Sequence, residues 1–446
     1  MTQHEPSDGL SELSAMFVGG SQYATAPEDP ERSRRRRRTR RIAGAISAAV
    51  VIALIVTYCS LTLTAPIGAA AAATQRPDVA TPAAAALAFP TGGESAVSIS
   101  GADTYLGAKA DGIFASSGGN DAIPMASISK LITALVILQA RPLGASGTGP
   151  TITFSKADHA LYDKYFVLNA TIAAMPTGSS MSEYDALETM LVVSACNYAE
   201  AMAEWAYGSD PAFIGAARTW IRAHGLTGTV MVEPTGIDAS NVSTPSDLIK
   251  LGKLVMATPA LAGIVAKTSL DVPALKGLPN TNNLLGSDGV DGIKTGTLQG
   301  SDLLFSSKED VGLPSPISIT GIVMDGPTRA AVDDEVRALI TSITAGFHTT
   351  QLGTKGEIVG TYSTAWGSKA RMVLAKDASA LTWSNAAITS TMTTTTLKTG
   401  ASGETVGTVI WKVGATTVTV PVVLDGAIRP PSTWWRLTHP FELSSK

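Results

Sequence analysis

The sequence predicts an α/β (α+β) protein with two folded parts, an enzyme-sized domain at residues 95–346 and an all-β domain at residues 347–446. In the first part, two alternating stretches precede a helical block, and three alternating stretches and a last helix follow it. This order favours one sheet covered by helices. After Gly346, Thr, Val and Gly dominate and helical periodicity stops. A chain of 446 residues is long enough for two such domains and their tails.

Residues 1–41 are predicted to form a disordered cytoplasmic tail that carries a block of arginines. Residues 1–31 mix Ser, Gly, Pro and acidic residues with little periodicity. The eight arginines and six acidic residues of 1–41 give this tail a charge of about +2. Because the net charge of the whole chain is −4, the remainder carries about −6. An acidic remainder argues against nucleic acid as a partner.

Residues 42–63 are apolar and uncharged, and they predict a single membrane-spanning helix, since about 20 such residues cross a bilayer. The arginines before them keep the N-terminal side in the cytoplasm, so the rest of the chain would be extracellular. A cleaved signal peptide is the alternative, because residues 69–73 are small, but the leader is long for one. Residues 64–94, rich in Ala, Pro and Thr, are interpreted as a linker that lifts the next domain off the membrane.

The elements of the first domain follow from periodicity, caps and breakers. Ser182 has capping-box spacing to Asp185, and Gly225 ends a helical pattern. Strands are expected at 96–100, 112–116, 151–154, 290–296, 302–307 and 317–324. Helices are expected from 130 onward and at 182–193, 198–203, 212–224, 244–256 and 328–345.

The second domain contains a weak internal repeat, in which residues 356–361 and 403–408 share the pattern Gly-Glu-x-Val-Gly-Thr. Two similar hairpins packed face to face would explain it. Five of the seven tryptophans also lie here, and we expect them to pack in the core, with glycan stacking or contact with a membrane surface as alternatives. They are Trp366, Trp383, Trp411, Trp434 and Trp435.

Ser127 and Lys130 form the first candidate catalytic motif. Pro124 lies just upstream of a helical pattern, so Ser127 should lie at a helix N-terminus, where free N–H groups favour developing negative charge. Lys130 is three residues on and therefore faces the same side, about one turn away. A serine becomes nucleophilic when a neighbouring base takes its proton, and a neutral lysine can be that base.

Two further motifs follow in order, one at residues 194–197 (Ser-Ala-Cys-Asn) and one at residues 294–297 (Lys-Thr-Gly-Thr). Ser194 is expected to relay a proton between the lysine and a leaving group. The third motif is expected to bind substrate. Its Lys294 would meet an anionic end, Thr295 would donate a hydroxyl, and Gly296 would let substrate backbone approach. The N–H groups of Ser127 and Thr297 could form an oxyanion hole.

The tripeptide Lys-Thr-Gly is common enough to occur twice, and the copy at residues 398–400 follows a run of threonines and predicts a turn. The five histidines show no metal-ligand spacing, so neither a metal nor a cofactor is expected. The two cysteines, Cys59 and Cys196, lie in the membrane segment and in the globular part, and they do not predict a disulfide framework.

Residues 95–345 resemble the D-alanyl-D-alanine carboxypeptidases, which are low-molecular-mass penicillin-binding proteins of the serine peptidase type. The stretches that carry the resemblance are 126–130, 233–238, 280–285 and 290–296. It implies the penicillin-recognising fold shared with β-lactamases, with a central antiparallel sheet of five strands between helix layers. It also implies that an acyl-enzyme on Ser127 releases the terminal D-Ala of peptidoglycan stem peptides, and that β-lactam antibiotics bind at the same site.

Two positions depart from the family pattern. Its middle motif is Ser-x-Asn, but Cys196 stands where the asparagine belongs and Asn197 follows one residue late. Either Asn197 swings in to bind substrate, or the substrate amide loses a partner at about 1–3 kcal/mol, or Cys196 is simply a small buried residue that the site tolerates. Relatives also often carry an arginine for the substrate carboxylate. Only Arg329 lies near that position here, so Lys294 and Thr295 are expected to bind the carboxylate instead.

Three functions are therefore compared. A membrane-anchored serine D-alanyl-D-alanine carboxypeptidase is the principal hypothesis. A wall-binding protein that has lost turnover is the second, because Cys196 replaces the asparagine. A β-lactamase is the third, although no carboxylate motif for activating a deacylating water stands out.

Overall fold

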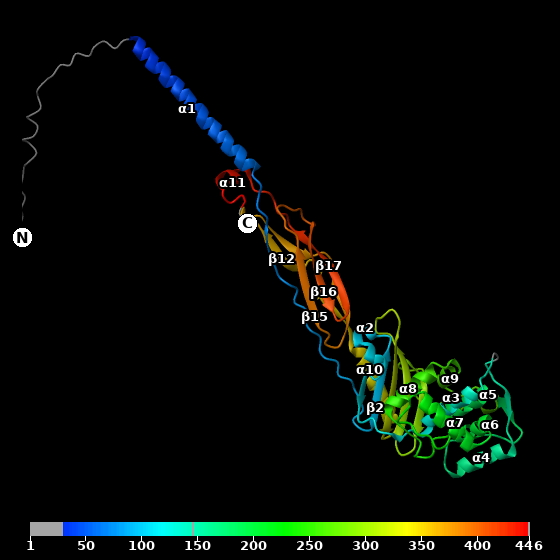
Figure 1. Cartoon of the computed structure of the whole chain (residues 1–446). Helices are drawn as coiled ribbons and strands as arrows, with labels where there is room; N and C mark the ends of the chain where they lie inside the picture. The colour runs from blue at the N-terminus through cyan, green and yellow to red at the C-terminus, as the bar shows by residue number, and fades with distance from the viewer. Residues whose placement is uncertain (1–29, 145–146, 445–446) are drawn as a thin grey trace, which may run out of the picture.

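The structure is a computed structural model that describes residues 30–144 and 147–444. Figure 1 shows three parts in a row, which are a long N-terminal helix, the β domain and the larger α+β domain. The C-terminal domain therefore lies between the N-terminal helix and the α+β domain. The predicted disorder of residues 1–29 lies outside the described residues.

Helix α1 (Pro30–Thr64) contains both the arginine block and the apolar run. The expectation of a disordered tail up to residue 41 is therefore wrong from residue 30 onward. Arginine has a high helix propensity, and an apolar helix that follows directly lets the basic turns continue it without a new nucleus. The helix is long and apolar enough to cross a membrane, with a mean hydropathy of 2.4 over its most apolar window.

The α+β domain is organised around one antiparallel sheet of five strands in the order β3-β2-β10-β9-β8. This confirms the predicted central antiparallel sheet. Strand β8 lies at the edge of the sheet, so one side of its backbone is free to pair with another chain. The strands are β2 (Glu94–Ser100), β3 (Ala115–Ser117), β8 (Val290–Thr297), β9 (Ser301–Glu309) and β10 (Ile317–Gly326).

Helices cover both faces of this sheet. One face packs against the helical block that includes α3 (Ser129–Ala140) and α8 (Pro245–Met256), and the other packs against α10 (Arg329–Ala345). The other helices of the domain are α2 (Asp103–Leu106), α4 (Lys156–Val167), α5 (Glu183–Val192), α6 (Cys196–Tyr207), α7 (Asp210–Ala223) and α9 (Pro259–Val265). Short strand pairs join β4 (Ile123–Pro124) to β7 (Val242–Ser243) and β5 (Thr151–Thr153) to β6 (Ser180–Ser182).

Helices α4 and α9 were not predicted. Helix α4 begins with a capping box between Ser155 and Asp158, but it buries Tyr165 alone among its residues and therefore shows little apolar periodicity. Helix α9 has seven residues, which is too short for a periodic pattern to stand out.

The β domain has a six-stranded sheet in the order β1-β12-β13-β17-β16-β15, and a separate pair β11-β14. Strand β1 (Ala71–Thr74) comes from the predicted linker, which runs along the β domain in Figure 1 and pairs with β12. The linker is thus partly a component of this domain and not a free spacer. The other strands are β11 (Phe347–Gly353), β12 (Ile358–Ser363), β13 (Lys369–Leu374), β14 (Ala378–Trp383), β15 (Ile388–Thr394), β16 (Thr405–Val413) and β17 (Thr416–Asp425).

The internal repeat produces the same structure twice, side by side in one sheet and not face to face. The Gly356 N–H donates to the Leu374 carbonyl, and the Gly403 N–H donates to the Leu424 carbonyl in the same way. Strands β13 and β17 pair between the two copies, so the sheet is approximately two-fold symmetric about that pair. Strand β1 occupies in one half the position that β15 occupies in the other.

The tryptophans of the β domain have different environments. Trp411 is fully buried in the domain core, as predicted, whereas Trp434 is 75% exposed. Trp434 lies in the short C-terminal helix α11 (Thr433–Thr438). Core packing therefore accounts for Trp411 and not for Trp434.

Candidate active site

Ser127 and Lys130 lie together at the start of helix α3. Ser127 is part of a 3₁₀ turn (Ala126–Ile128) that leads directly into α3, as the position of Pro124 predicted. The Ser127 hydroxyl is half-buried, and the Lys130 side chain is fully buried. Lys130 Nζ lies 3.0 Å from Ser127 Oγ, which is hydrogen-bonding distance for proton transfer.

The backbone carbonyl of Thr235 orients the Lys130 amine. Lys130 Nζ donates to Thr235 O at 2.7 Å, and it also approaches Cys196 Sγ at 3.4 Å. A neutral amine has two N–H donors and one lone pair. Because the carbonyl can only accept, it takes an N–H, and in the neutral form of the amine the lone pair would be left for the Ser127 hydroxyl. Thr235 thus does for the lysine what an orienting group does for a catalytic base.

The loop that carries Thr235 is fixed by a buried polar network. The Glu233 carboxylate accepts from the backbone N–H groups of Thr235 and Gly236, both at 2.6 Å, and Asn241 in turn donates to Glu233. Gly236 has φ +81°, and a Cβ there would lie 1.8 Å from the Ala126 carbonyl oxygen. The glycine therefore lets this loop press against the turn that carries Ser127.

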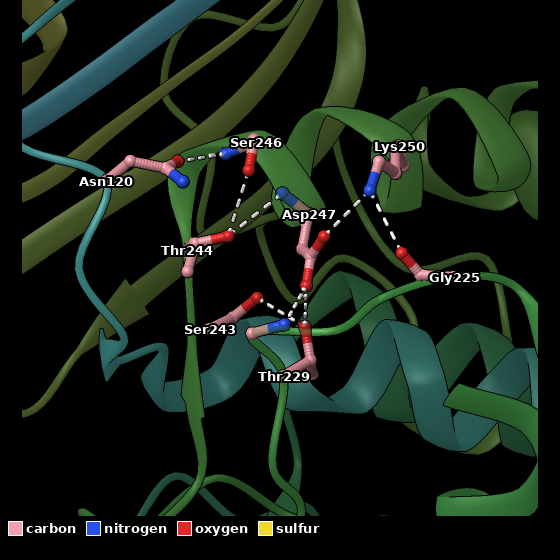
Figure 2. A network of polar contacts seen from close by, with 9 residues as sticks. Asn120, Gly225, Thr229, Ser243, Thr244, Ser246, Asp247 and Lys250 are labelled. Atoms are coloured by element: carbon pink, nitrogen blue, oxygen red, sulfur yellow. Dashed lines mark hydrogen bonds and ion pairs between the residues drawn. The ribbon is translucent and has the colours of Figure 1, made fainter. Parts of the chain in front are cut away.

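Figure 2 shows how the base of the same loop is attached to helix α8. The Asp247 carboxylate accepts from the Gly228 N–H at 2.7 Å and from the Thr229 hydroxyl at 3.1 Å. Thr244 caps the helix by accepting from the Asp247 N–H. Residues 228 and 229 are thereby held rigidly against α8, and the loop reaches Lys130 from a fixed base.

The second motif reaches the same place through the start of helix α6. Cys196, in its first turn, is 4% exposed and contacts the Lys130 amine. Ser194 is also 4% exposed and has φ +64°, so it lies at a sharp turn between α5 and α6. The role of Ser194 as a proton relay stays a prediction.

Asn197 does not face the site. Its amide nitrogen donates to the Ala173 carbonyl at 2.8 Å, and its amide oxygen accepts from the Ala173 N–H at 3.1 Å. The side chain is fully buried, and its two hydrogen bonds hold residue 173 against helix α6. The expected substrate-binding role of Asn197 is wrong, because one residue along a helix turns a side chain by about 100°. Cys196, and not Asn197, contacts the Lys130 amine.

The third motif lies at the end of edge strand β8. Lys294 is 2% exposed, and its ammonium donates to Thr281 Oγ1 at 3.3 Å and to the Thr295 carbonyl at 3.2 Å. Burial lowers the pKa of Lys294 well below its usual value, and the positive charges of Lys130 and Arg329 lower it further. The coupling to Lys130 joins the first and third motifs in one electrostatic site.

Gly296 lets two parts of the protein approach each other. A Cβ at this position would lie 2.6 Å from Asp302 Oδ2, 3.1 Å from the Met125 carbonyl oxygen and 3.2 Å from the Ala126 Cβ. The glycine therefore brings β8 against the turn of Ser127. The sequence suggested that Gly296 lets substrate backbone approach the strand. In the structure, the close packing of β8 against the turn of Ser127 also requires a glycine at this position.

Two residues of the site were underestimated from the sequence. Thr281 lies at the end of a long loop and accepts from Thr295 Oγ1 at 2.6 Å. Arg329, at the start of α10, donates to the Thr281 carbonyl and to Thr297 Oγ1, both at 2.9 Å. The guanidinium therefore reaches the end of β8, which spacing along the chain alone did not show.

One group of acidic side chains has oxygen atoms close enough together to bind a metal ion. Carboxylate oxygens of Glu200, Glu204 and Asp210 lie within 4.8 Å of one another. However, Glu200 accepts from the Lys164 ammonium at 2.6 Å and from the Tyr165 hydroxyl. Burial and the nearby Glu200 charge raise the pKa of Asp210 to about 6. These contacts favour an ion pair with a shared proton.

A family model described as D-alanyl-D-alanine carboxypeptidase matches residues 102–326. The chain is 27% identical over 193 residues to the D-alanyl-D-alanine carboxypeptidase DacC of Escherichia coli, a match that covers 42% of this chain and 48% of the relative. It is 35% identical over 129 residues to an E. coli D-alanyl-D-alanine endopeptidase, covering 29% of this chain and 38% of that protein. The matches thus span about half of these relatives or less.

Solved structures are similar in fold. Penicillin binding protein 6B from Escherichia coli matches with a TM-score of 0.52 and 18% identity, over 78% of this chain and 99% of the other. Penicillin binding protein 5 from Haemophilus influenzae matches with a TM-score of 0.50 and 19% identity, over 79% of this chain and all of the other. At these identities the likeness concerns the fold alone.

Proposed function

Because this chain belongs to the D-alanyl-D-alanine carboxypeptidase family, we propose that it releases the terminal D-Ala of peptidoglycan stem peptides through an acyl-enzyme on Ser127. One observation carries the proposal. The buried amine of Lys130 lies 3.0 Å from Ser127 Oγ while the Thr235 carbonyl takes one of its N–H groups. A lysine held in this way can accept the serine proton.

The reaction would proceed in two steps. Ser127 Oγ attacks the carbonyl of the penultimate D-Ala, and its proton moves to the neutral Lys130. The N–H groups of Ser127 and Thr297 hold the developing oxyanion. The tetrahedral intermediate breaks its C–N bond, and Ser194 passes the proton from the lysine to the leaving amine. Water then attacks the ester, Lys130 takes its proton, and Ser127 is regenerated.

The end of β8 supplies the substrate-binding groups. The terminal carboxylate would meet the Arg329 guanidinium and the hydroxyls of Thr295 and Thr297, with the Lys294 charge behind them. The substrate backbone would add to the free edge of β8 as an extra antiparallel strand. A β-lactam ring presents the same carbonyl and carboxylate, so it would acylate Ser127 as well.

A catalytically impaired wall-binding protein is the second candidate. The Cys196 thiol contacts the Lys130 amine where a relative has an amide, and a thiol cannot both donate to and accept from a substrate amide. The same purified protein distinguishes the two functions. Release of free D-Ala from a pentapeptide supports the carboxypeptidase. Penicillin labelling without D-Ala release supports the impaired protein, and a Cys196→Asn variant that gains release would strengthen that conclusion.

The test of Ser127 uses the full chain in detergent micelles and a fluorescent penicillin. The wild-type protein and the matched control Ser315→Ala, which changes an exposed loop serine, should both become labelled. Ser127→Ala should lose labelling, and mass spectrometry should map the wild-type adduct to Ser127. Labelling that survives in Ser127→Ala would refute the proposal.

Anchoring in the cell membrane by α1, with the catalytic domain extracellular, is part of the same proposal. About 30 Å of hydrocarbon, counted from Arg41 at 1.5 Å per residue, ends near Leu61. The C-terminal helix α11 meets α1 at this level. Arg436 donates to the Leu63 and Ala65 carbonyls at 3.1 and 2.8 Å, and the Tyr58 hydroxyl donates to the Leu437 carbonyl at 2.6 Å. The exposed Trp434 next to this contact suits the outer interface of a bilayer.

A further inference from the structure

A cavity of about 270 Å³ lies on the α+β domain, between helix α7 and the segment 226–231 that leads to the Thr235 loop. Part of its lining is apolar and buried, since Ile221 and Leu226 both pack into the domain core. Val230, on another wall, is 49% exposed and presents an uncovered apolar side chain. None of the lining residues belongs to the three motifs of the candidate active site. The cavity is therefore a separate feature of the molecule.

Two exposed arginines line the same cavity. Arg218 and Arg222 are four residues apart on α7, so their side chains leave the same side of the helix about one turn apart. Within residues 30–144 and 147–444, neither guanidinium forms an ion pair. Arg218 Nε donates to the Met231 carbonyl at 3.5 Å, and Arg222 Nη2 donates to the Thr219 hydroxyl at 3.3 Å. Because a guanidinium has five N–H donors, most of them remain available to a ligand.

The carboxylate behind one wall of the cavity already has its own partners. Thr229, a lining residue, donates its hydroxyl to Asp247 at 3.1 Å, and Asp247 pairs with the Lys250 ammonium at 3.0 Å (Figure 2). Among the described residues that line the cavity, only the two arginines are charged. Like charges one turn apart on a helix repel each other, and an anion bound between them removes that repulsion. The cavity is therefore suited to a negatively charged ligand.

The number of positive charges favours phosphate over a single carboxylate. One guanidinium alone can bind a carboxylate through two parallel hydrogen bonds. A phosphate monoester carries a charge of about −1.5 to −2 at pH 7 and three acceptor oxygens, so it can engage both guanidiniums at once. The exposed side chain of Val230 offers a contact for the carbon body of the ester. In Figure 1 the β domain separates α7 from α1, so lipid phosphates around α1 are out of reach.

We propose that this cavity binds an organic phosphate monoester, with Arg218 and Arg222 as its counter-charges and Val230 against its carbon body. The volume of about 270 Å³ has room for a phosphate group and a small apolar substituent, since one water molecule takes a share of about 30 Å³ in the liquid. The site goes beyond the proposed peptidase function. It gives the α+β domain a second ligand, at the end of the molecule that lies farthest from α1 (Figure 1).

The test measures the binding of three probes to the full chain in detergent micelles by isothermal titration calorimetry. The probes are phenyl phosphate, inorganic phosphate, which lacks the ring, and benzoate, which carries one charge. We expect phenyl phosphate to bind about 10-fold more tightly than either of the others. Arg218→Gln and Arg222→Gln should each weaken its binding about 10-fold or more, and Val230→Ser should remove its advantage over inorganic phosphate. The matched control Arg329→Gln, at the candidate active site, should leave its affinity unchanged.

Two results would overturn the site. One is benzoate that binds as tightly as phenyl phosphate, because the second arginine would then contribute nothing. The other is binding that Arg329→Gln weakens and Arg222→Gln does not, which would place the anion in the candidate active site. If Arg218→Gln melts at a lower temperature because its bond to Met231 is lost, Arg222→Gln alone decides between the outcomes. Failure of the carboxypeptidase assignment is distinguishable, because no probe in this experiment reacts with Ser127.

Discussion

The same tripeptide, Lys-Thr-Gly, has opposite environments in the two domains of this protein. At the end of β8, Lys294 and Thr295 are 2% and 3% exposed. In the β domain, Lys398 and Thr399 are exposed in a bend, and Gly400 pairs with Ile428. The second copy is a structural turn, as its flanking threonines predicted. The tripeptide can therefore take part in chemistry only where the fold surrounds it with other functional groups.

The surroundings of the first copy come from segments far apart in the chain. Thr281 accepts a hydrogen bond from Thr295, Arg329 reaches the end of β8, and Lys130 lies close enough to lower the pKa of Lys294. Removal from water strengthens each of these interactions. In the β domain, by contrast, the chain achieves order through local repetition, because each Gly-Glu turn makes the same backbone hydrogen bonds.

The largest expected difference between the two copies concerns acylation. Lys294→Met should lower the second-order rate of penicillin acylation by about 10²-fold or more, since it removes a desolvated charge opposite the ligand carboxylate. Lys398→Met should leave the rate unchanged. Stopped-flow or gel-based labelling of both variants measures this directly. Equal rates for the two variants would mean that the β8 lysine has no role in binding.

A smaller effect is expected for the neighbouring hydroxyls. Thr295→Val should lower kcat/KM for the peptide about 10-fold, because it removes one donor to the carboxylate and one of the two hydrogen bonds that Thr281 Oγ1 accepts. Thr399→Val provides the matched change at the exposed copy and should have no effect. D-Ala release measured over a range of substrate concentrations separates KM from kcat. An unaffected Thr295→Val would leave carboxylate binding to Arg329 and Lys294.

The smallest difference concerns stability and has the opposite sign. Because the pKa of Lys294 is depressed in the folded state, the unfolded chain binds more protons between that pKa and about 10.5, and stability rises with pH across this window. The burial of this amine therefore costs stability at neutral pH. Lys294→Met should raise Tm by about 2–4 °C at pH 7 and flatten the rise toward high pH.

Differential scanning fluorimetry at several pH values checks this, with Lys398→Met as the control. The control should match the wild-type protein, since an exposed lysine loses little hydration on folding. A Lys294→Met variant that melts lower than the wild type at pH 7 would show that its contacts with Thr281 and Thr295 outweigh the cost of burial.

Much of the fold followed from local pattern. The order of strands and helices, the helical turn at Ser127 that leads into α3, and the change to a β domain after Gly346 all depend on periodicity, caps and breakers within short windows. Helix α4 was not predicted because it is largely exposed, and strand β1 was not predicted because it pairs with a strand almost 290 residues away.

The sequence by itself determined which groups could react, since a serine, two lysines and their spacing are properties of the chain. Only the tertiary structure decided which of them meet. It turned Asn197 toward Ala173 and Cys196 toward Lys130, brought the Thr235 carbonyl to the Lys130 amine, and carried Arg329 to the end of β8. The reason is physical. Hydrogen bonds act over about 3 Å, so the chemistry depends on side-chain directions and long-range packing that no local pattern encodes.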